Sequence, residues 1–176
     1  QVTVSLGGEL LFLGGLVSSA EEGRARIRNA REDGSGAEYF ARMVAALGGP
    51  TDLVEHSDHH LEKAAVVVPV MAKESGYLVK MDAREIGLAL VHLGGGRTRA
   101  DQKIDYAVGF ENFVDLNDYV SQQQPIAFVH ARTKSEAEKA ILNILKACVI
   151  AEEPEKNIQS NCVYDRIALD QDGEED

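Results

Sequence analysis

A run of three glycines, Gly94–Gly96, separates an apolar segment from Arg97 and restricts how the middle of the chain can fold. Asp82, with Glu85 three residues later, has the spacing of a capping box and predicts a helix that begins there. The apolar residues that follow extend this helix to Leu93, so the first glycine falls where a left-handed C-terminal cap is needed. A helix C-terminus repels phosphate. We therefore interpret the run as a bend in the chain rather than a phosphate cradle.

From about residue 63 the chain mixes patterns typical of strands with patterns typical of helices. The strand-like runs, rich in β-branched residues, are "KAAVVVPVMA", "YLVKM", "IDYAVGF", "PIAFVHA" and, near the end, "CVYDRIAL". The helix from Asp82 to Leu93 is apolar on nearly every side, which predicts that it is buried. The sequence therefore predicts an α+β fold for this part.

A second helix of this part is predicted over "KSEAEKAILNILKACVI", with Ser135 as its N-terminal cap. Its apolar residues form one stripe, which consists of Ala137, Ile141, Ile144, Leu145, Cys148 and Val149. This pattern predicts an amphipathic helix. Because Cys148 lies on the stripe, we interpret it as a small core residue.

The first 50 residues predict three short helices separated by glycines. The first ends at Gly14, and the second begins at a capping box formed by Ser19 and Glu22 and ends near Gly34. The third, over about residues 37–47, has one apolar face, made of Ala37, Phe40, Ala41, Val44 and Leu47. Narrow faces make a poor core by themselves, so we expect these helices to belong to a larger helical unit.

The chain has 176 residues, of which 44% are hydrophobic, and a net charge of −11. A chain this acidic offers no basic stripe for nucleic acid or for an anionic membrane. Two cysteines, Cys148 and Cys162, make no disulfide framework, and no apolar run approaches the roughly 20 residues that span a bilayer. We therefore expect a cytoplasmic protein. Residues 170–176 form an acidic tail that we expect to be disordered.

The densest group of metal-ligand residue types contains His56, Asp58, His59, His60 and Glu62. Imidazole and carboxylate groups suit zinc, and the first and last of these histidines would share one face of a helix. However, the segment is a polar connector, in which exposed side chains have no reason to converge. We therefore predict no metal site, and no other cofactor is expected.

His92 and His130 are the remaining candidates for acid–base chemistry. Because His92 falls in the helix predicted to be buried and His130 ends a predicted strand, we interpret both as hydrogen-bonded packing residues. No Ser or Cys has an identifiable base partner in the sequence, which leaves nucleophilic catalysis without support.

The stretches "ESGYLVKMD" and "LNDYVSQQQPIAFVHA" have the outline of a biotinyl or lipoyl carrier domain, in which a Lys beside a Met on a hairpin is modified. Lys80 and Met81 would be that pair. Against this interpretation, Lys80 leads directly into the capped helix instead of a tight exposed hairpin. A carrier module and a non-catalytic interaction domain remain alternatives.

Five stretches in family order resemble the C-terminal part of the thymidine phosphorylases, within the pyrimidine-nucleoside phosphorylase family. They are "FARMVAALGGPTDLVE", "AKESGYLVKMDAREIGLALVHLGGGR", "IDYAVGF", "DYVSQQQPIAFVHA" and "VYDRI". The most specific combination is "MDxxxIGxAxxxLGGGR" followed by "IDxxVGF". The chain departs from the family at Asn117, Gln122 and Gln123, in a turn region where the family usually carries glycine.

The resemblance implies an enzyme that uses phosphate to cleave thymidine into thymine and 2-deoxyribose 1-phosphate. It also implies that the residues that bind phosphate and the base lie in the N-terminal part of the full protein, and none of those motifs is found in this sequence. The chain also begins without Met, in a stretch that looks like the middle of a helix. We therefore expect an inactive fragment, roughly the last two fifths of its parent. The sequence leaves the choice between thymidine and uridine open.

The resemblance further implies a homodimeric parent and three regions within this chain. Residues 1–62 would be a helical segment and connector of the nucleoside phosphorylase domain, residues 63–169 an α/β hammerhead domain, and residues 170–176 the acidic tail. The glycine run and the arginine after it would form a structural or domain-boundary loop, made of Gly94, Gly95, Gly96 and Arg97. The arginine would pair with a carboxylate or with another part of the parent.

Overall fold

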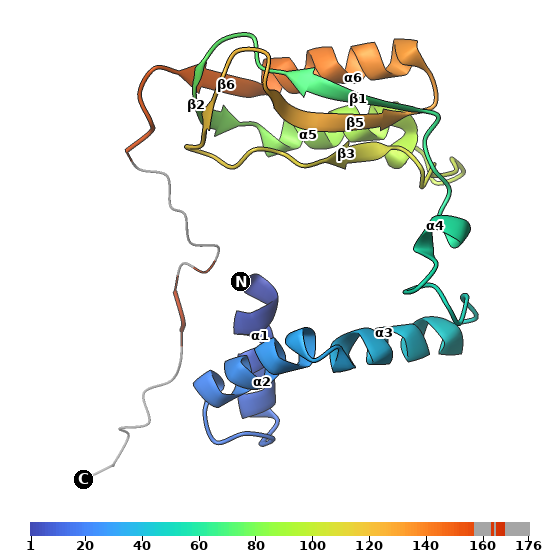
Figure 1. The fold of residues 1–176 in the computed structure, drawn as a ribbon, viewed down its shortest axis with the longest axis vertical. Helices are drawn as coiled ribbons and strands as arrows, with labels where there is room; N and C mark the ends of the chain where they lie inside the picture. Colours follow the sequence, from blue (N-terminus) through green and yellow to red (C-terminus); the bar gives the residue numbers. More distant parts are fainter. Residues whose placement is uncertain (157–162, 164, 168–176) are drawn as a thin grey trace. The chain divides into compact units, whose positions relative to one another are not determined.

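The computed structural model describes residues 1–156, 163 and 165–167 (Figure 1). The chain divides into two compact units, one formed by residues 1–57 with residues 159–176 and the other by residues 58–158. The first unit is helical, and the second combines helices with two antiparallel sheets. The predicted α+β class is confirmed, with the helices first along the chain.

The helical unit contains three helices, which are α1 (Val2–Leu13), α2 (Ala20–Glu32) and α3 (Ser35–Ala46). The predicted ends are confirmed, because Gly14 caps α1 and Gly34, at φ +84°, separates α2 from α3. Ser19 caps α2 by accepting a hydrogen bond from the Glu22 N–H at 3.2 Å. The Glu22 carboxylate accepts hydrogen bonds from the N–H and the hydroxyl of Ser18 rather than from Ser19. The capping residue was therefore predicted correctly, and the reciprocal half of the box lies one residue earlier.

α1 and α2 contact each other through glycine. A Cβ placed on Gly23 would lie 2.5 Å from the carbonyl oxygen of Gly8, and a Cβ on Gly8 would lie 2.9 Å from the backbone nitrogen of Arg24. These two glycines are the buried residues of α1 and α2. The helices are therefore held together by a close approach of their backbones rather than by interlocking large side chains.

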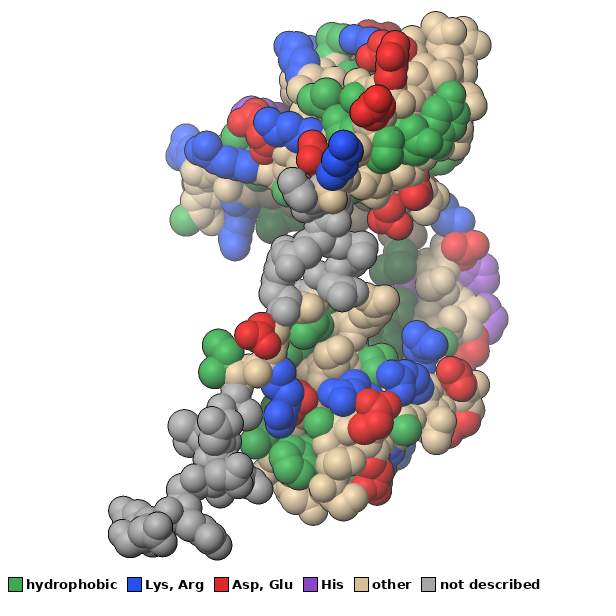
Figure 2. All heavy atoms as spheres, turned by 90° about the vertical axis from the view of Figure 1, so that its left-hand side faces the viewer, with side chains coloured by type: hydrophobic (Ala, Val, Ile, Leu, Met, Phe, Trp, Pro, Cys, Tyr) green, Lys and Arg blue, Asp and Glu red, His purple; other side chains and the backbone are tan. Residues whose placement is uncertain are grey.

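Many of the large apolar side chains of the helical unit are exposed. Leu13 and Leu47 are 78% and 81% exposed, and Phe40, on the predicted face of α3, is 47% exposed. Figure 2 shows hydrophobic side chains open at the surface of this unit, scattered among charged ones. Within its described residues, no large apolar side chain of this unit is buried.

The second unit has two three-stranded antiparallel sheets. The first has the order β1-β5-β3, with β1 (Val66–Met71), β5 (Pro125–Ala131) and β3 (Gly109–Glu111). The second has the order β4-β2-β6, with β4 (Tyr119–Val120), β2 (Gly76–Met81) and β6 (Cys148–Ala151). β1 and β2 are consecutive along the chain but lie in different sheets, so the "ESG" turn between them does not close a hairpin.

The helices of this unit are α4 (Ser57–His60), α5 (Ala83–Leu90), the π-helical turn η1 (Val91–Gly95) and α6 (Lys134–Ala147). α6 packs on β1 and β5 and also contacts α5. The core lies between α6 and the sheets, and its largest fully buried side chains are Leu78, Ile126, Ile144, Val70, Val120 and Val129. All of them belong to the second unit.

The helix that begins at Asp82 is more exposed than its composition predicts. The Asp82 carboxylate caps α5 by accepting hydrogen bonds from the N–H groups of Arg84 and Glu85, both at 3.1 Å. Ala89 is the buried residue of α5, and Leu88 is 41% exposed. The prediction of a buried helix is wrong, because α5 is covered on one side by α6 and carries small residues at that contact.

The end of the second long helix was also placed incorrectly. α6 ends at Ala147, and the next four residues form β6, which pairs with β2. Cys148 is therefore partly buried in a strand, and Val149 points outward at 45% exposure. The cap is Thr133 rather than Ser135, because Thr133 and Glu136 form a complete capping box. The apolar period of the helix continues past Ala147, but pairing with the distant strand β2 makes these residues a strand.

The remaining strand predictions had different outcomes. "KAAVVVPVMA", "YLVKM" and "PIAFVHA" contain β1, β2 and β5, which confirms them. In "IDYAVGF" only the last two residues lie in a strand, and β4 was not predicted. Half of the strand predicted at "CVYDRIAL" and all of the acidic tail lie outside the described residues.

Candidate functional site

The glycine run forms the C-terminal end of the α5–η1 helix. Gly94 has φ +103° and ψ −3°, a conformation that side chains with a Cβ rarely adopt, so the predicted positive φ is confirmed. A Cβ on Gly95 would lie 2.5 Å from Cδ1 of Leu90. The glycines therefore allow both a sharp change of direction and a close return over the preceding helical turn.

A hydrogen-bonded cluster holds this loop in place. The carbonyl oxygen of Gly94 accepts a hydrogen bond from the Asp105 N–H at 2.9 Å. The Asp105 carboxylate then accepts two hydrogen bonds from Arg132, from Nε at 2.6 Å and from an Nη at 2.7 Å, and a third from the Ala107 N–H at 3.0 Å. Arg132 also pairs with Glu62 at 2.8 Å. One aspartate thus joins the glycine loop, the approach to β3 and the end of β5.

The electrostatics of this cluster favour its charged form. The two hydrogen bonds from Arg132, followed by the one from the Ala107 N–H, lower the pKa of Asp105 below its ordinary value. The hydrogen bonds to Asp105 and Glu62 raise the pKa of Arg132. Both side chains are partly exposed, at 27% and 36%, so solvent screens their attraction. The cluster anchors three segments, and its donors and acceptors are already occupied by one another.

Arg97 lies outside this cluster. Its side chain is exposed and, among the described residues, forms no ion pair. It borders an open hollow of about 330 Å³ together with Lys103 and Tyr106. Tyr106 is 89% exposed. Of the predicted loop residues, the glycines are therefore held by the fold, and Arg97 is directed toward solvent.

The histidines did not all behave as predicted. His92 lies on η1 and is exposed, so its interpretation as a buried packing residue is wrong. His130 lies within β5 and is 27% exposed, with its Nε2 atom 2.9 Å from Oε1 of Glu111 on the neighbouring strand β3. That nitrogen makes no contact with hydrogen-bond geometry in the described part of the chain. The interaction is therefore a cross-strand ion pair whenever the imidazole is protonated.

In the polar connector, His56 lies just before α4, Asp58, His59 and His60 lie on it, and Glu62 follows it. Asp58 pairs with Lys63 at 3.3 Å, and Glu62 pairs with Arg132. His60 and Glu62 border a shallow hollow of about 680 Å³ that also includes Glu111 and His130. Within the described residues, no group of three His, Cys, Asp or Glu side chains has the geometry to hold a metal ion.

Two of the three positions that depart from the family's glycines adopt positive φ. Asn117 has φ +68° and Gln123 has φ +62°. Asn117 exchanges two side-chain hydrogen bonds with the backbone of Glu155, at 2.8 and 2.9 Å. The backbone N–H of Gln122 donates to the Ser75 hydroxyl, and its side-chain amide donates to the Lys73 carbonyl. These hydrogen bonds stabilise a backbone conformation that glycine adopts easily, although no glycine is present at these positions.

The possible modification site at Lys80 is part of a paired strand. Lys80 lies in β2 opposite Val149 of β6, and Met81 is followed at once by the cap of α5. A carrier lysine would instead occupy the exposed tip of a hairpin. The geometry therefore does not favour the carrier interpretation.

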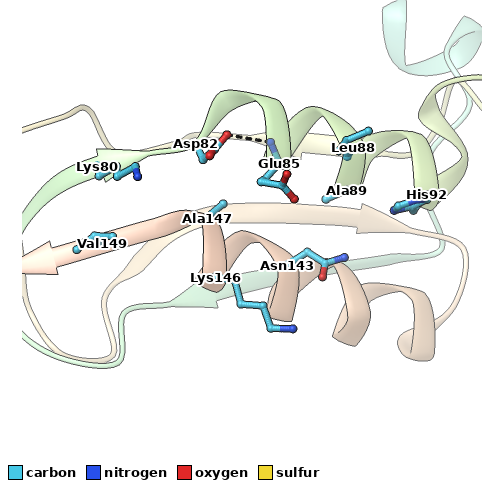
Figure 3. A pocket seen from close by; sticks show the side chains of 10 residues that line it. All are labelled: Lys80, Asp82, Glu85, Leu88, Ala89, His92, Asn143, Lys146, Ala147 and Val149. Carbon is cyan, nitrogen blue, oxygen red and sulfur yellow. Dashed lines mark hydrogen bonds between the residues drawn. The ribbon is translucent and has the colours of Figure 1, made fainter.

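A groove runs between α5 and α6, and sequence reasoning did not identify it (Figure 3). Two adjoining hollows of about 230 and 510 Å³ form it, and both are bordered by Ala89, His92, Asn143 and Lys146. Figure 3 shows Glu85 directed from α5 toward α6, whose Asn143 and Lys146 form the opposite side. The signal in the sequence is a set of polar residues at helical spacing on each of two helices. These residues can be identified as one site only when the two helices are known to contact each other.

Residues 77–151 match the family described as "Pyrimidine nucleoside phosphorylase C-terminal domain". A thymidine phosphorylase of Burkholderia lata is 46% identical over 152 residues, which are 86% of this chain and 35% of that protein. Thymidine phosphorylases of Burkholderia cenocepacia and Burkholderia orbicola are each 45% identical over the same length. The chain spans about a third of the length of these relatives.

In the described part of the chain, no helix has the length and apolarity needed to cross a membrane.

Proposed function

Because residues 77–151 match the C-terminal domain of the pyrimidine nucleoside phosphorylases, we propose that this chain belongs to that family and functions as part of a thymidine phosphorylase. The parent reaction cleaves the glycosidic bond of thymidine with phosphate and gives thymine and 2-deoxyribose 1-phosphate. The observation that carries this proposal is the 46% identity to a thymidine phosphorylase over 152 residues. The parent is a homodimer of the cytoplasm, and phosphate and the nucleoside are its substrates.

In the proposed reaction, phosphate attacks C1′ of the sugar as the bond to the base breaks. The bond between C1′ and the phosphate oxygen forms, and the electron pair of the broken bond leaves with the pyrimidine. Catalysis then depends on holding both substrates in line and stabilising the departing base. Asp105 and Arg132, which anchor the glycine loop, are charged groups that are occupied by each other. This supports the proposal that the catalytic set lies in the remaining part of the parent.

Residues 63–169 would then form the α/β hammerhead domain of the parent, and residues 1–62 would belong to its nucleoside phosphorylase domain. The loop formed by Gly94, Gly95, Gly96 and Arg97 would lie at the boundary between these domains. Support for this role comes from its two halves. The glycines are fixed through Asp105, whereas Arg97 is exposed and, within the described residues, has no carboxylate partner.

The first test is an assay of the chain by itself. Purified chain incubated with thymidine and phosphate should release no thymine above the blank, measured by chromatography. Turnover by the purified chain that persists after a second purification would show that the catalytic groups lie in this segment.

The second test replaces the matching segment of the Burkholderia lata enzyme with this chain. The chimera should release thymine only when phosphate is present. Uridine in place of thymidine would report the base preference. A folded chimera that binds thymidine but does not cleave it, while the unmodified relative does, would contradict the proposed function.

A further inference from the structure

We propose that the groove between α5 and α6 binds a small organic phosphate ester. The two hollows that form the groove share residues from both helices, so they make one continuous channel. Lys80 borders one hollow, Lys139 borders the other, and Lys146 borders both. The proposal rests on this arrangement of lysines and on what surrounds them.

The walls of the groove are two facing rows of residues. Lys139, Asn143 and Lys146 have the spacing of residues on one face of α6. Two helical turns separate the lysines, so their Cα atoms lie about 10 Å apart along the groove. Glu85 and His92 form the matching row on the α5 side (Figure 3). Residues with ammonium, amide, imidazole and carboxylate groups therefore border the same channel.

The three lysines are not neutralised by ion pairs. All three are exposed, and within the described residues none of them forms an ion pair with a carboxylate. This contrasts with the arginines of α2, where Arg24 and Arg28 both pair with Glu21. A chain with a net charge of −11 thus keeps three cations around one groove that have no ion pair in the described part of the chain.

The groove also contains three carboxylates, from Asp82, Glu85 and Glu136. Each of them lies at a helix N-terminus, where the positive end of the helix dipole offsets its charge. Asp82 accepts hydrogen bonds from two backbone N–H groups, and Glu136 accepts them from Thr133. Backbone hydrogen bonds therefore hold Asp82 and Glu136, and within the described residues none of the three carboxylates forms an ion pair with a lysine of the groove.

The side chains of the groove suit an anion with more than one negative charge. Lysine binds phosphate as a point charge, and because a phosphate group carries about −1.5 to −2 charges at neutral pH, several ammonium groups attract it more strongly than a single carboxylate. Among the described residues that border the groove there are three lysines and no arginine. The floor is apolar, with Ala89, Leu93 and Ala147. A phosphate ester fits this combination because its organic part can cover the apolar floor.

The test is a titration of the complete chain with ribose 5-phosphate, followed by NMR amide shifts and calorimetry. We expect saturable binding with shifts at Asn143 and Lys146, and weaker binding of inorganic phosphate, succinate and ribose. Lys146→Glu and Lys139→Glu should each reduce affinity by about tenfold or more. Raising the salt concentration should also weaken binding, since the contacts are charged.

The matched control is Lys103→Glu, which makes the same charge change at the hollow beside Arg97. It should leave binding within about twofold of wild type. Thermal unfolding of each variant checks that it is folded, and Lys80→Gln replaces any variant that is not. Binding lost in Lys103→Glu but kept in Lys146→Glu would overturn the proposal. So would equal affinity for ribose 5-phosphate and inorganic phosphate, or the absence of saturable binding.

Discussion

The two units of this chain use the same kinds of apolar residues in opposite ways. In residues 58–158, valine, leucine and isoleucine side chains from both sheets and α6 are fully buried together. In α1–α3, Leu6, Leu10, Leu13 and Phe40 are exposed, and the buried residues are glycines. Most of the free energy of folding comes from apolar burial. The mixed unit therefore contains its own core, whereas the helical unit depends on a surface that covers its leucines.

We expect the largest difference between the two units from one apolar substitution in each of them. Ile144→Ala should destabilise the chain by about 2–5 kcal/mol, because Ile144 is fully buried and its removal leaves a cavity. Phe40→Ala in α3 should change the stability by less than about 0.5 kcal/mol, because that side chain is half exposed. Urea unfolding of both variants measures the difference. Similar losses in both would show that the helices share the core.

A second pair of substitutions compares a glycine from each unit. Gly94→Val should lower the unfolding free energy by about 1–2 kcal/mol, because valine is strained at φ +103°. Gly23→Ala should push α1 and α2 apart, since its Cβ would lie 2.5 Å from the Gly8 carbonyl oxygen. It should nevertheless leave the main thermal transition unchanged, because that transition belongs to the mixed unit. A drop in that transition for Gly23→Ala would contradict the division.

A third comparison measures how the stability of each unit changes as the pH is lowered, and we expect it to show the smallest difference. The pKa values of Asp105 and Glu21 are both lowered, the first mainly by Arg132 and the second mainly by Arg24. A carboxylate with a lowered pKa in the folded state adds stability above its unfolded pKa, and this stability is lost as the pH falls through the folded pKa. Only Asp105 links distant segments of the mixed unit.

Asp105→Asn should therefore make the stability of the mixed unit less dependent on pH below about pH 4, where the unfolded carboxylate titrates. Glu21→Gln should leave that dependence as in wild type, because its partners lie on the same helix. Thermal unfolding between neutral and acidic pH measures both. An unchanged acid profile in Asp105→Asn would show that the cluster does not contribute to folding.

Local signals explain which features of this fold were predictable. The caps at Ser19 and Asp82 and the positive φ of Gly94 follow from neighbouring residues, and all three are confirmed. β6 was missed because its pairing with β2 brings together residues about 70 positions apart, and this pairing overrides the helical period. The missed strand shows that periodicity identifies apolar faces better than it identifies their ends.

The candidate sites show the same limit. The glycine loop was identified from its residues, but its anchor was not, because Arg132 is 27 positions from Asp105. The α5–α6 groove was missed for a related reason, since its lysines come from a strand and from a helix that meet only in the folded unit. The histidines between His56 and His60 were predicted to form no metal site, and the neighbouring carboxylates of Asp58 and Glu62 pair with Lys63 and Arg132.

Hydrogen exchange of the complete chain tests most directly whether the mixed unit is the part that supports its own fold. We expect slow exchange in β1, β2, β5 and α6, with a free energy of opening close to the global free energy of unfolding. We expect fast exchange throughout α1–α3. Mass spectrometry of peptides from both units after a common labelling time would measure it. Equal protection in α1–α3 and in the sheets would contradict the account, because it would show that the helical unit is stable without a further surface over its leucines.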